Sequence, residues 1–176
     1  INSVSSRAGA HEQARYLMHT SYEQRATIKH PGIGAYMLKY LGKLNQDLPG
    51  NVFIGGNSRI DGGAGFFESS YEPLAINNPE SGLRNIRARF NPTDFRNNLD
   101  LAAELDGGFR KKYNLKATRA YTSMYKDAVR LMESEDLKAF DLSIESEATR
   151  EMYGDNPFGQ GCLLAKRLVQ HDVRAI

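Results

Sequence analysis

The alternation of helical and strand-like segments is the feature that most constrains the fold of this chain. The segment NVFIGG at 51–56 is a β-branched and aromatic run ended by glycines, which is typical of a short buried strand. Near the other end, the helical pattern GQGCLLAKRLVQH leads directly into VRAI, a second β-like segment. Helices alternating with strands favour an α/β domain over an all-helical bundle. We therefore expect a mixed sheet flanked by helices.

Two helices are predicted before the first strand. Residues 10–19 carry Ala14, Leu17 and Met18 at spacings of three and four, which suit one buried helical face. Pro31 is placed to open the next helix, because proline is favoured in a first helical turn. The expected apolar side of that helix consists of Ile33, Tyr36, Met37, Tyr40 and Leu41.

Asparagine followed by proline marks the start of two later helices. Asn91 and Pro92 begin a helical hairpin over 91–134, and Asn156 and Pro157 begin the last helix, since asparagine caps free N–H groups and proline suits the first turn. The apolar stripe on the second helix of the hairpin is expected to be core rather than a cofactor contact. It consists of Tyr121, Met124, Tyr125, Ala128, Leu131 and Met132.

Length and composition are those of one ordinary domain, with 176 residues of which 40% are hydrophobic. We divide residues 1–176 into four parts. They are a strand-helix part (1–56), a long loop (57–90), the helical hairpin (91–134) and a helix-strand part (135–176). The short apolar segments that open at Ile1 and close at Ile176 suggest strands, so we expect both ends to be cuts through a larger domain.

Charge and cysteine usage exclude several classes of function. The chain has 23 basic and 21 acidic residues, and this near balance does not favour nucleic acid or a membrane surface as a partner. No run approaches the ~20 apolar residues of a membrane span. The single cysteine, Cys162, lies in an apolar run and is expected to be a small buried side chain rather than a reactive thiol.

Residue patterns alone indicate few catalytic candidates. The glycine-rich loop that contains Arg59 and Asp61 lacks a phosphate-binding motif, so it is interpreted as a solvated loop. His19, His30 and His171 are interpreted as structural, with His171 favouring the negative end of a helix. The acidic groups around 133–136 and 145–147 are interpreted as solvated faces and caps.

His11 and Glu12 are better candidates for a ligand-binding site. If the opening segment is a strand, they lie at the helix start beyond its carboxyl end, where α/β sheets bind ligands. Their motif HEQAR is not the metalloprotease HExxH, because Arg15 stands where the second histidine is needed. A lone histidine is more commonly a surface or hydrogen-bonding residue than a metal ligand.

Four ordered segments nevertheless resemble one family. They are AGAHEQARYLMHTSY, HPGIGAYMLKYLGKLNQDLPGNVFIGG, GAGFFESSYEPLAINNP and FDLSIESEATREMYGDNPFGQGCLLAKRLVQHDVRAI. In this order they resemble the bacterial domain of unknown function numbered 1501, a sulfatase-like branch of the alkaline-phosphatase superfamily. The match covers nearly the whole chain.

The resemblance implies a large exported α/β domain that hydrolyses a small-molecule sulfate or phosphate ester at a divalent-metal site holding zinc, calcium or manganese. In the family pattern, most metal ligands lie in N- and C-terminal segments that are missing here, so these would be partners of this chain. His11 and Glu12 align with a segment near the metal site, and Arg15 is a candidate contact for the substrate anion. The metal-held nucleophile would then attack sulfur or phosphorus.

Three hypotheses follow. The chain is the central part of a metal-dependent ester hydrolase, and we expect it to be inactive and without a bound metal on its own. Alternatively, it is a non-catalytic interaction or assembly module that retains the scaffold without the metal site. A third hypothesis is a structural domain that only mimics the family pattern.

Overall fold

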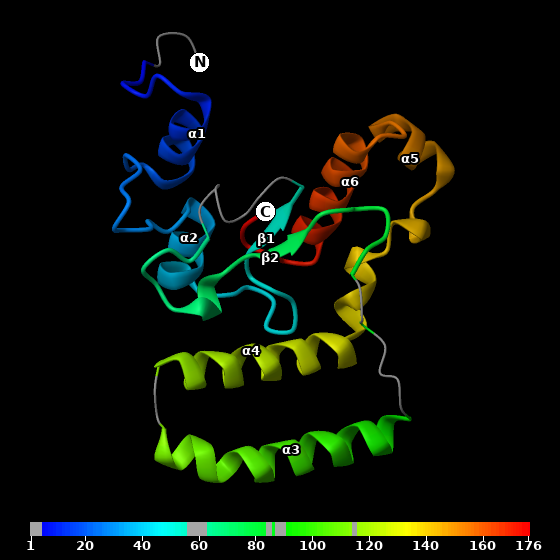
Figure 1. Cartoon of the computed structure of the whole chain (residues 1–176). Helices are drawn as coiled ribbons and strands as arrows, with labels where there is room; N and C mark the ends of the chain where they lie inside the picture. Colours follow the sequence, from blue (N-terminus) through cyan, green and yellow to red (C-terminus); the bar gives the residue numbers. More distant parts are fainter. Residues whose placement is uncertain (1–4, 56–62, 84–85, 87–90, 114–115) are drawn as a thin grey trace.

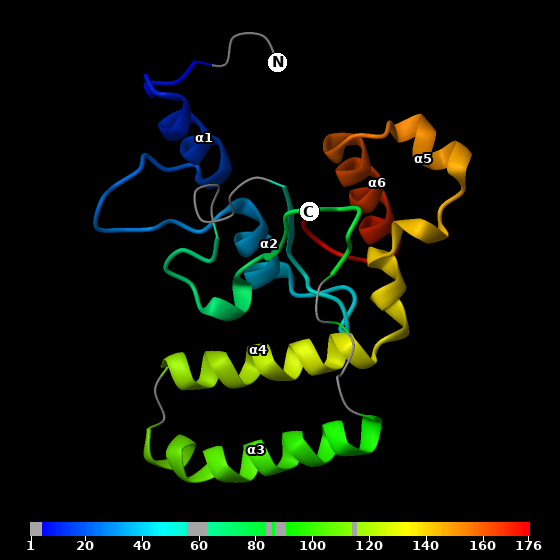
Figure 2. The same ribbon diagram turned by 45° about the vertical axis from the view of Figure 1, so that its right-hand side comes forward.

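The computed structural model describes residues 5–55, 63–83, 86, 91–113 and 116–176, with the backbone alone at 92, 110 and 116–120. Most of the described chain is helical (Figures 1 and 2). The main helices are α1 (His11–Thr20), α2 (Ile33–Leu41), α3 (Pro92–Lys112), α4 (Lys116–Glu133), α5 (Glu147–Tyr153) and α6 (Pro157–Gln170). Short 3-10 turns are η1 (Ser69–Tyr71), η2 (Glu135–Phe140) and η3 (Leu142–Ile144).

A small parallel sheet lies between α2 and α6 (Figure 1). Its two strands are β1 (Val52–Ile54) and β2 (Leu74–Ile76), with Val52 opposite Leu74 and Ile54 opposite Ile76. Asn51, the residue just before β1, forms a parallel bridge with Ala175, and the Val52 N–H donates to the Ala175 carbonyl at 2.9 Å. The described residues therefore confirm a helix-rich arrangement that contains both helices and strands, but their sheet has two parallel strands instead of the mixed sheet expected.

Helix α6 supplies most of the core. The Asn156 side chain caps its first turn by accepting the Gly159 N–H at 2.9 Å, and Pro157 occupies the first helical position. Leu163, Leu164 and Leu168 of this helix are then buried. The buried core consists of Leu48, Val52, Ile76, Ala139, Phe140, Leu142, Leu163, Leu164, Leu168 and Val173. The predicted capping and the buried leucines of this helix are confirmed.

The hairpin of α3 and α4 lies at one end of the molecule, with α3 on the far side of α4 in both views (Figures 1 and 2). Asn91 caps α3 as predicted, accepting the Asp94 N–H at 2.9 Å. Arg96 of α3 pairs with Glu133 of α4 at 3.3 Å. The helices were predicted correctly. The core position of the apolar stripe on α4 was wrong at Tyr121, Met124 and Tyr125, which are exposed, whereas Leu131 packs against the core as predicted.

Two other expected apolar faces are also open to solvent. Met18 of α1 is 72% exposed, and the buried residues of that helix are Tyr16 and Thr20. In α2, which begins at Ile33 rather than at Pro31, the buried residues are Ala35 and Leu38. The predicted face of α2 was wrong at its exposed members Ile33, Tyr40 and Leu41. Periodicity located the helices, whereas the direction each one faces depends on neighbouring elements.

The predicted long loop contains more structure than expected. Residues 57–62, including Arg59 and Asp61, lie outside the described residues, as do residues 1–4 of the opening segment predicted to be a strand. Farther along, η1 and β2 show that the loop interpretation was wrong over 69–71 and 74–76. The strand LAI is too short to show a period of two, and its partner is distant in the sequence.

Candidate functional site

A polar cavity of about 450 Å³ lies beside α1. We call it the histidine cleft; it is lined by Glu12, Tyr16, Gln24, Arg25, Ala26, Ile28, Lys29, His30, Gly63, Gly65 and Glu72. Its volume is within the range of about 300–1,000 Å³ that small-molecule sites usually have. Three separate segments thus meet here: the first turns of α1, the residues before Pro31, and the glycine-containing turn that leads to η1.

His30 is the most constrained side chain of the cleft. It is 9% exposed, and its Nδ1 lies 3.0 Å from the Tyr16 hydroxyl. The backbone N–H of His30 donates to the same hydroxyl oxygen at 2.8 Å. The Tyr22 ring stacks on the imidazole with centroids 4.3 Å apart, and Phe66 meets it edge-on. The ring is therefore held in one orientation.

The glycine turn approaches the backbone of His30 closely. Gly65 has a φ of +56°, and a Cβ at this position would collide with the backbone of His30 and Pro31. The Gly32 N–H donates to the Gly63 carbonyl at 3.0 Å, and Glu72 accepts the Ala64 N–H at 2.6 Å. Glycine at position 65 is therefore required by the close packing that forms one wall of the cleft.

The residues predicted from the sequence are only partly brought together. Glu12 is exposed and lines the histidine cleft, whereas His11, also exposed on the first turn of α1, is not among the lining residues. Arg15 is exposed on the same helix but does not line the cleft. His30, which was interpreted as structural, was missed as a site residue. The preceding Lys29 and following Pro31 gave no signal of its hydrogen bond to Tyr16.

The described residues do not fit a divalent-metal site by themselves. Within 5–55, 63–83, 86, 91–113 and 116–176, no three His, Cys, Asp or Glu side chains gather closely enough to hold a metal ion. A catalytic zinc usually has three protein ligands, and calcium takes six or more oxygens. Glu12 in the cleft could supply one ligand at most.

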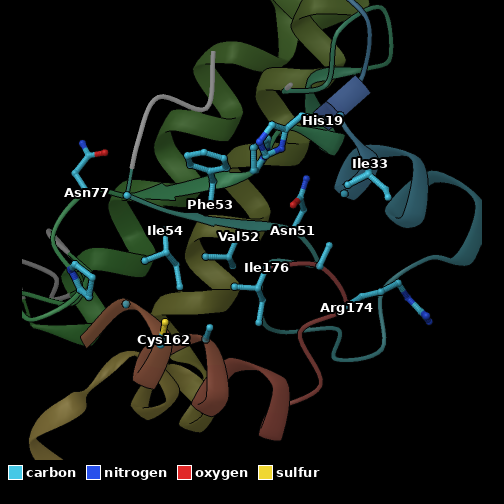
Figure 3. A pocket seen from close by; sticks show the side chains of 18 of the residues that line it. His19, Ile33, Asn51, Val52, Phe53, Ile54, Asn77, Cys162, Arg174 and Ile176 are labelled. Atoms are coloured by element: carbon cyan, nitrogen blue, oxygen red, sulfur yellow. The ribbon is translucent and has the colours of Figure 1, made fainter. Parts of the chain in front are cut away.

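A second, larger cavity has a different chemical character. This apolar groove, of about 810 Å³, lies where β1 is bordered by α2 and α6, with Ile33, Phe53, Ile54 and Ile176 around it (Figure 3). Cys162 lines the groove and is exposed, so the prediction of a buried cysteine was wrong. His19 also lies on this groove, away from the histidine cleft.

The acidic side chains interpreted as solvated are partly structural. Glu145 accepts from Arg167 at 2.6 Å, and this hydrogen bond holds the pKa of Glu145 below its usual value. Asp136 accepts from Asn45 at 2.7 Å and lies 3.1 Å from His171 Nδ1; these contacts lower the pKa of Asp136, with Asn45 contributing most. The interpretation as solvated faces was wrong for these two carboxylates.

A family model described as "Protein of unknown function (DUF1501)" matches residues 1–176. No curated protein and no solved structure matches the chain. In the part of the chain that the structure describes, no helix has the length and apolar character needed to span a membrane.

Proposed function

The chain belongs to the DUF1501 family, and from this premise we propose that it forms the central part of a metal-dependent hydrolase of sulfate or phosphate esters. The resemblance to sulfatase-like proteins is the source of the reaction class. Membership of the family removes the hypothesis of a domain that only mimics the pattern. An exported location, in the periplasm or outside the cell, is part of the same proposal.

The observation that carries the proposal is the composition of the histidine cleft. Glu12, placed near the site from the sequence, shares the cleft with His30, Arg25 and Lys29. Arginine and lysine side chains suit the oxygens of a sulfuryl or phosphoryl group, which are negatively charged before and during the reaction. The cleft thus offers cations and a fixed imidazole on the chain that the family resemblance assigns to an ester hydrolase.

The metal ligands have to come from elsewhere in this proposal. The described side chains do not gather as a metal site. We therefore assign most of the metal ligands to the N- and C-terminal segments that carry the family's Asp and His motifs. A bound divalent ion would polarise the ester and activate the attacking oxygen. The role of the present residues is to bind and orient the ester beside it.

The test is hydrolysis of an aryl sulfate and an aryl phosphate by the full-length protein, with zinc, calcium or manganese and after chelation. We expect turnover of one ester that chelation abolishes. Glu12→Gln should lower kcat/KM at least tenfold, whereas Glu151→Gln, at an exposed position on α5, should leave it unchanged. A metal-loaded protein that turns over neither ester would refute the hydrolase proposal.

One observation favours a non-catalytic interaction or assembly module as the second candidate. On α3, Leu101, Leu105 and Phe109 recur every four residues and are all exposed, so they form an apolar stripe facing solvent. A full-length protein with neither bound metal nor turnover, but with a stable complex to a partner, would support this candidate.

A further inference from the structure

We propose that the histidine cleft binds the ester substrate itself, with His30 donating to its anionic group, and that the organic part of this ester carries hydroxyl groups. The inference rests on the proposed function for the nature of the ester bond. The ligand class follows from the mixture of side chains in the cleft. A phosphate or sulfate ester of a sugar has this chemistry.

The direction that we assign to the hydrogen bond between Tyr16 and His30, from the hydroxyl to Nδ1, sets which nitrogen of His30 is available to a ligand. The Tyr16 oxygen accepts the His30 backbone N–H at 2.8 Å, so its own proton is free to be donated to Nδ1 at 3.0 Å. With Nδ1 as acceptor, the neutral imidazole carries its proton on Nε2. No hydrogen bond to Nε2 is formed by the residues that the structure describes. His30 therefore keeps one oriented N–H donor for a ligand in the cleft.

The arrangement has the features of a functional histidine. A side chain that acts on a ligand is commonly oriented by a second group through its other polar atom. Here Tyr16 is the orienting group, and stacking by Tyr22 restricts the ring further. A histidine that only filled the core would not need to line a polar cavity, as His30 does.

The charges of the cleft select the ligand. Arg25 and Lys29 favour an anionic group, and together with the Nε2 donor they supply three contacts to its oxygens. Glu12 and Glu72 also line the cavity, so the formal charges of these four side chains cancel. A bare anion would gain little from a cavity without net charge. An ester with hydroxyl groups suits both the cations and the carboxylates, because its anionic group accepts from the cations and its hydroxyls donate to the carboxylates.

The two carboxylates have different tasks. Glu72 already accepts the Ala64 N–H through Oε2, so it anchors the glycine turn. Glu12 lies on the first turn of α1, and no hydrogen bond from the described residues occupies its carboxylate. Glu12 is thus the side chain that we assign to a ligand hydroxyl.

Binding can be tested without catalysis. Calorimetry on the metal-free, full-length protein would compare glucose 6-phosphate, glucose 6-sulfate, phenyl phosphate and inorganic phosphate. We expect one of the sugar esters to bind at least tenfold more tightly than phenyl phosphate and inorganic phosphate. Equal affinities for the sugar ester and phenyl phosphate would overturn the assignment of a hydroxylated substrate.

Variants locate the binding site. Lys29→Met and His30→Gln should each weaken sugar-ester binding about tenfold, because each removes or displaces a charged or charge-assisted contact. Glu12→Gln should weaken the sugar ester but leave phenyl phosphate unchanged. Lys126→Met, at an exposed site on α4, is the matched control for lost charge. Lys29 is also exposed, so its substitution tests the cleft even if His30→Gln fails to fold.

The outcomes separate this inference from the proposed function. Sugar-ester binding that depends on Lys29 and Glu12, in a protein that never turns over an ester, would support the cleft as a binding site and refute the proposed hydrolase activity. Turnover that is insensitive to substitutions at Glu12, Lys29 and His30 would support the hydrolase and overturn the cleft as its substrate site.

Discussion

Arg167 shows how a single side chain can join separate elements. It is 8% exposed on α6, and its guanidinium donates to the carbonyls of Lys138 and Ala139 as well as to Glu145. These contacts tie α6 to η2 and to the segment before α5. The buried guanidinium is tolerated because three of its five N–H donors are used in this way, one of them in an ion pair with Glu145.

Substitution of Arg167 should therefore destabilise the fold. Arg167→Met leaves Glu145 without its main partner and removes one donor from each of two carbonyls, and we expect a loss of ~3 kcal/mol in the free energy of unfolding. Urea denaturation would measure this loss. Lys166→Met, which removes the more exposed partner of Glu145, should cost less than about 1 kcal/mol. Equal effects of the two substitutions would contradict the structural role of Arg167.

Acid should weaken the same region. The pKa values of Asp136, Asp141 and Glu145 lie below their usual values, chiefly through hydrogen bonds from Asn45, Ser143 and Arg167 respectively. A carboxyl with a lowered pKa in the folded state stabilises the fold above its unfolded pKa of about 4, and this contribution is lost as the pH falls through the folded pKa. The free energy of unfolding should thus decrease from pH 5 toward pH 2.

The Glu145→Gln variant provides the control for this pH dependence. It lacks one of the three titrating groups, so the decrease in its free energy of unfolding over the same range should be smaller than that of the unsubstituted chain. An unchanged pH dependence in the variant would show that the ionised Glu145 does not stabilise the fold.

At the scale of elements, two glycines in helices have opposite surroundings. Gly159 lies in the first turn of α6 against the backbone of Tyr153 and Gly154, and an added Cβ would collide with the Tyr153 carbonyl. Gly107 lies within α3, and nothing stands within 4 Å of the position of its Cβ. Of these two glycines, close packing therefore requires only Gly159, at the junction of α5 and α6.

Alanine substitutions should separate these two cases. Gly159→Ala should lower the free energy of unfolding by about 1–3 kcal/mol, since the α5–α6 turn has to move. Gly107→Ala should raise the stability of α3 by roughly 0.5–1 kcal/mol, because alanine is the better helix former. Urea denaturation, together with hydrogen exchange of α3, would measure both. Destabilisation of α3 by Gly107→Ala would contradict the open surroundings of this glycine.

On the scale of the whole molecule, large apolar side chains remain exposed on several elements, including α3 and the first turn of α6. Leu105 is 73% exposed on α3 at one end, and Phe158 is 82% exposed beside the apolar groove of Figure 3. Contiguous exposed apolar surface usually marks a site of association. Such surface is compatible both with further segments of a larger domain and with an assembly partner.

The 176-residue chain is therefore expected to self-associate. Sedimentation should reveal species larger than a monomer at micromolar concentration, and the dye ANS should bind. Leu105→Gln should reduce association without lowering the free energy of unfolding by more than about 0.5 kcal/mol, because its side chain is largely exposed. A monodisperse monomer that unfolds cooperatively and binds no dye would contradict this expectation.

The sequence by itself determined the features that depend on near neighbours. Asn91 and Asn156 predicted the starts of α3 and α6, because a capping side chain accepts hydrogen bonds from N–H groups within the next three residues. The strand at Val52 and the buried leucines of α6 were also readable from short patterns. Ordered segments along the whole chain identified the family, which the family match confirms.

Only the tertiary structure decided which surfaces meet. Parallel pairing of β1 with β2, the solvent-facing stripe on α3 and the partners of Arg167 all depend on contacts between distant segments. The same holds for the histidine cleft: Glu12 was a candidate from the sequence, but His30 became one only through its hydrogen bonds to Tyr16. Local patterns report how a segment folds, whereas burial and orientation are set by the elements packed against it.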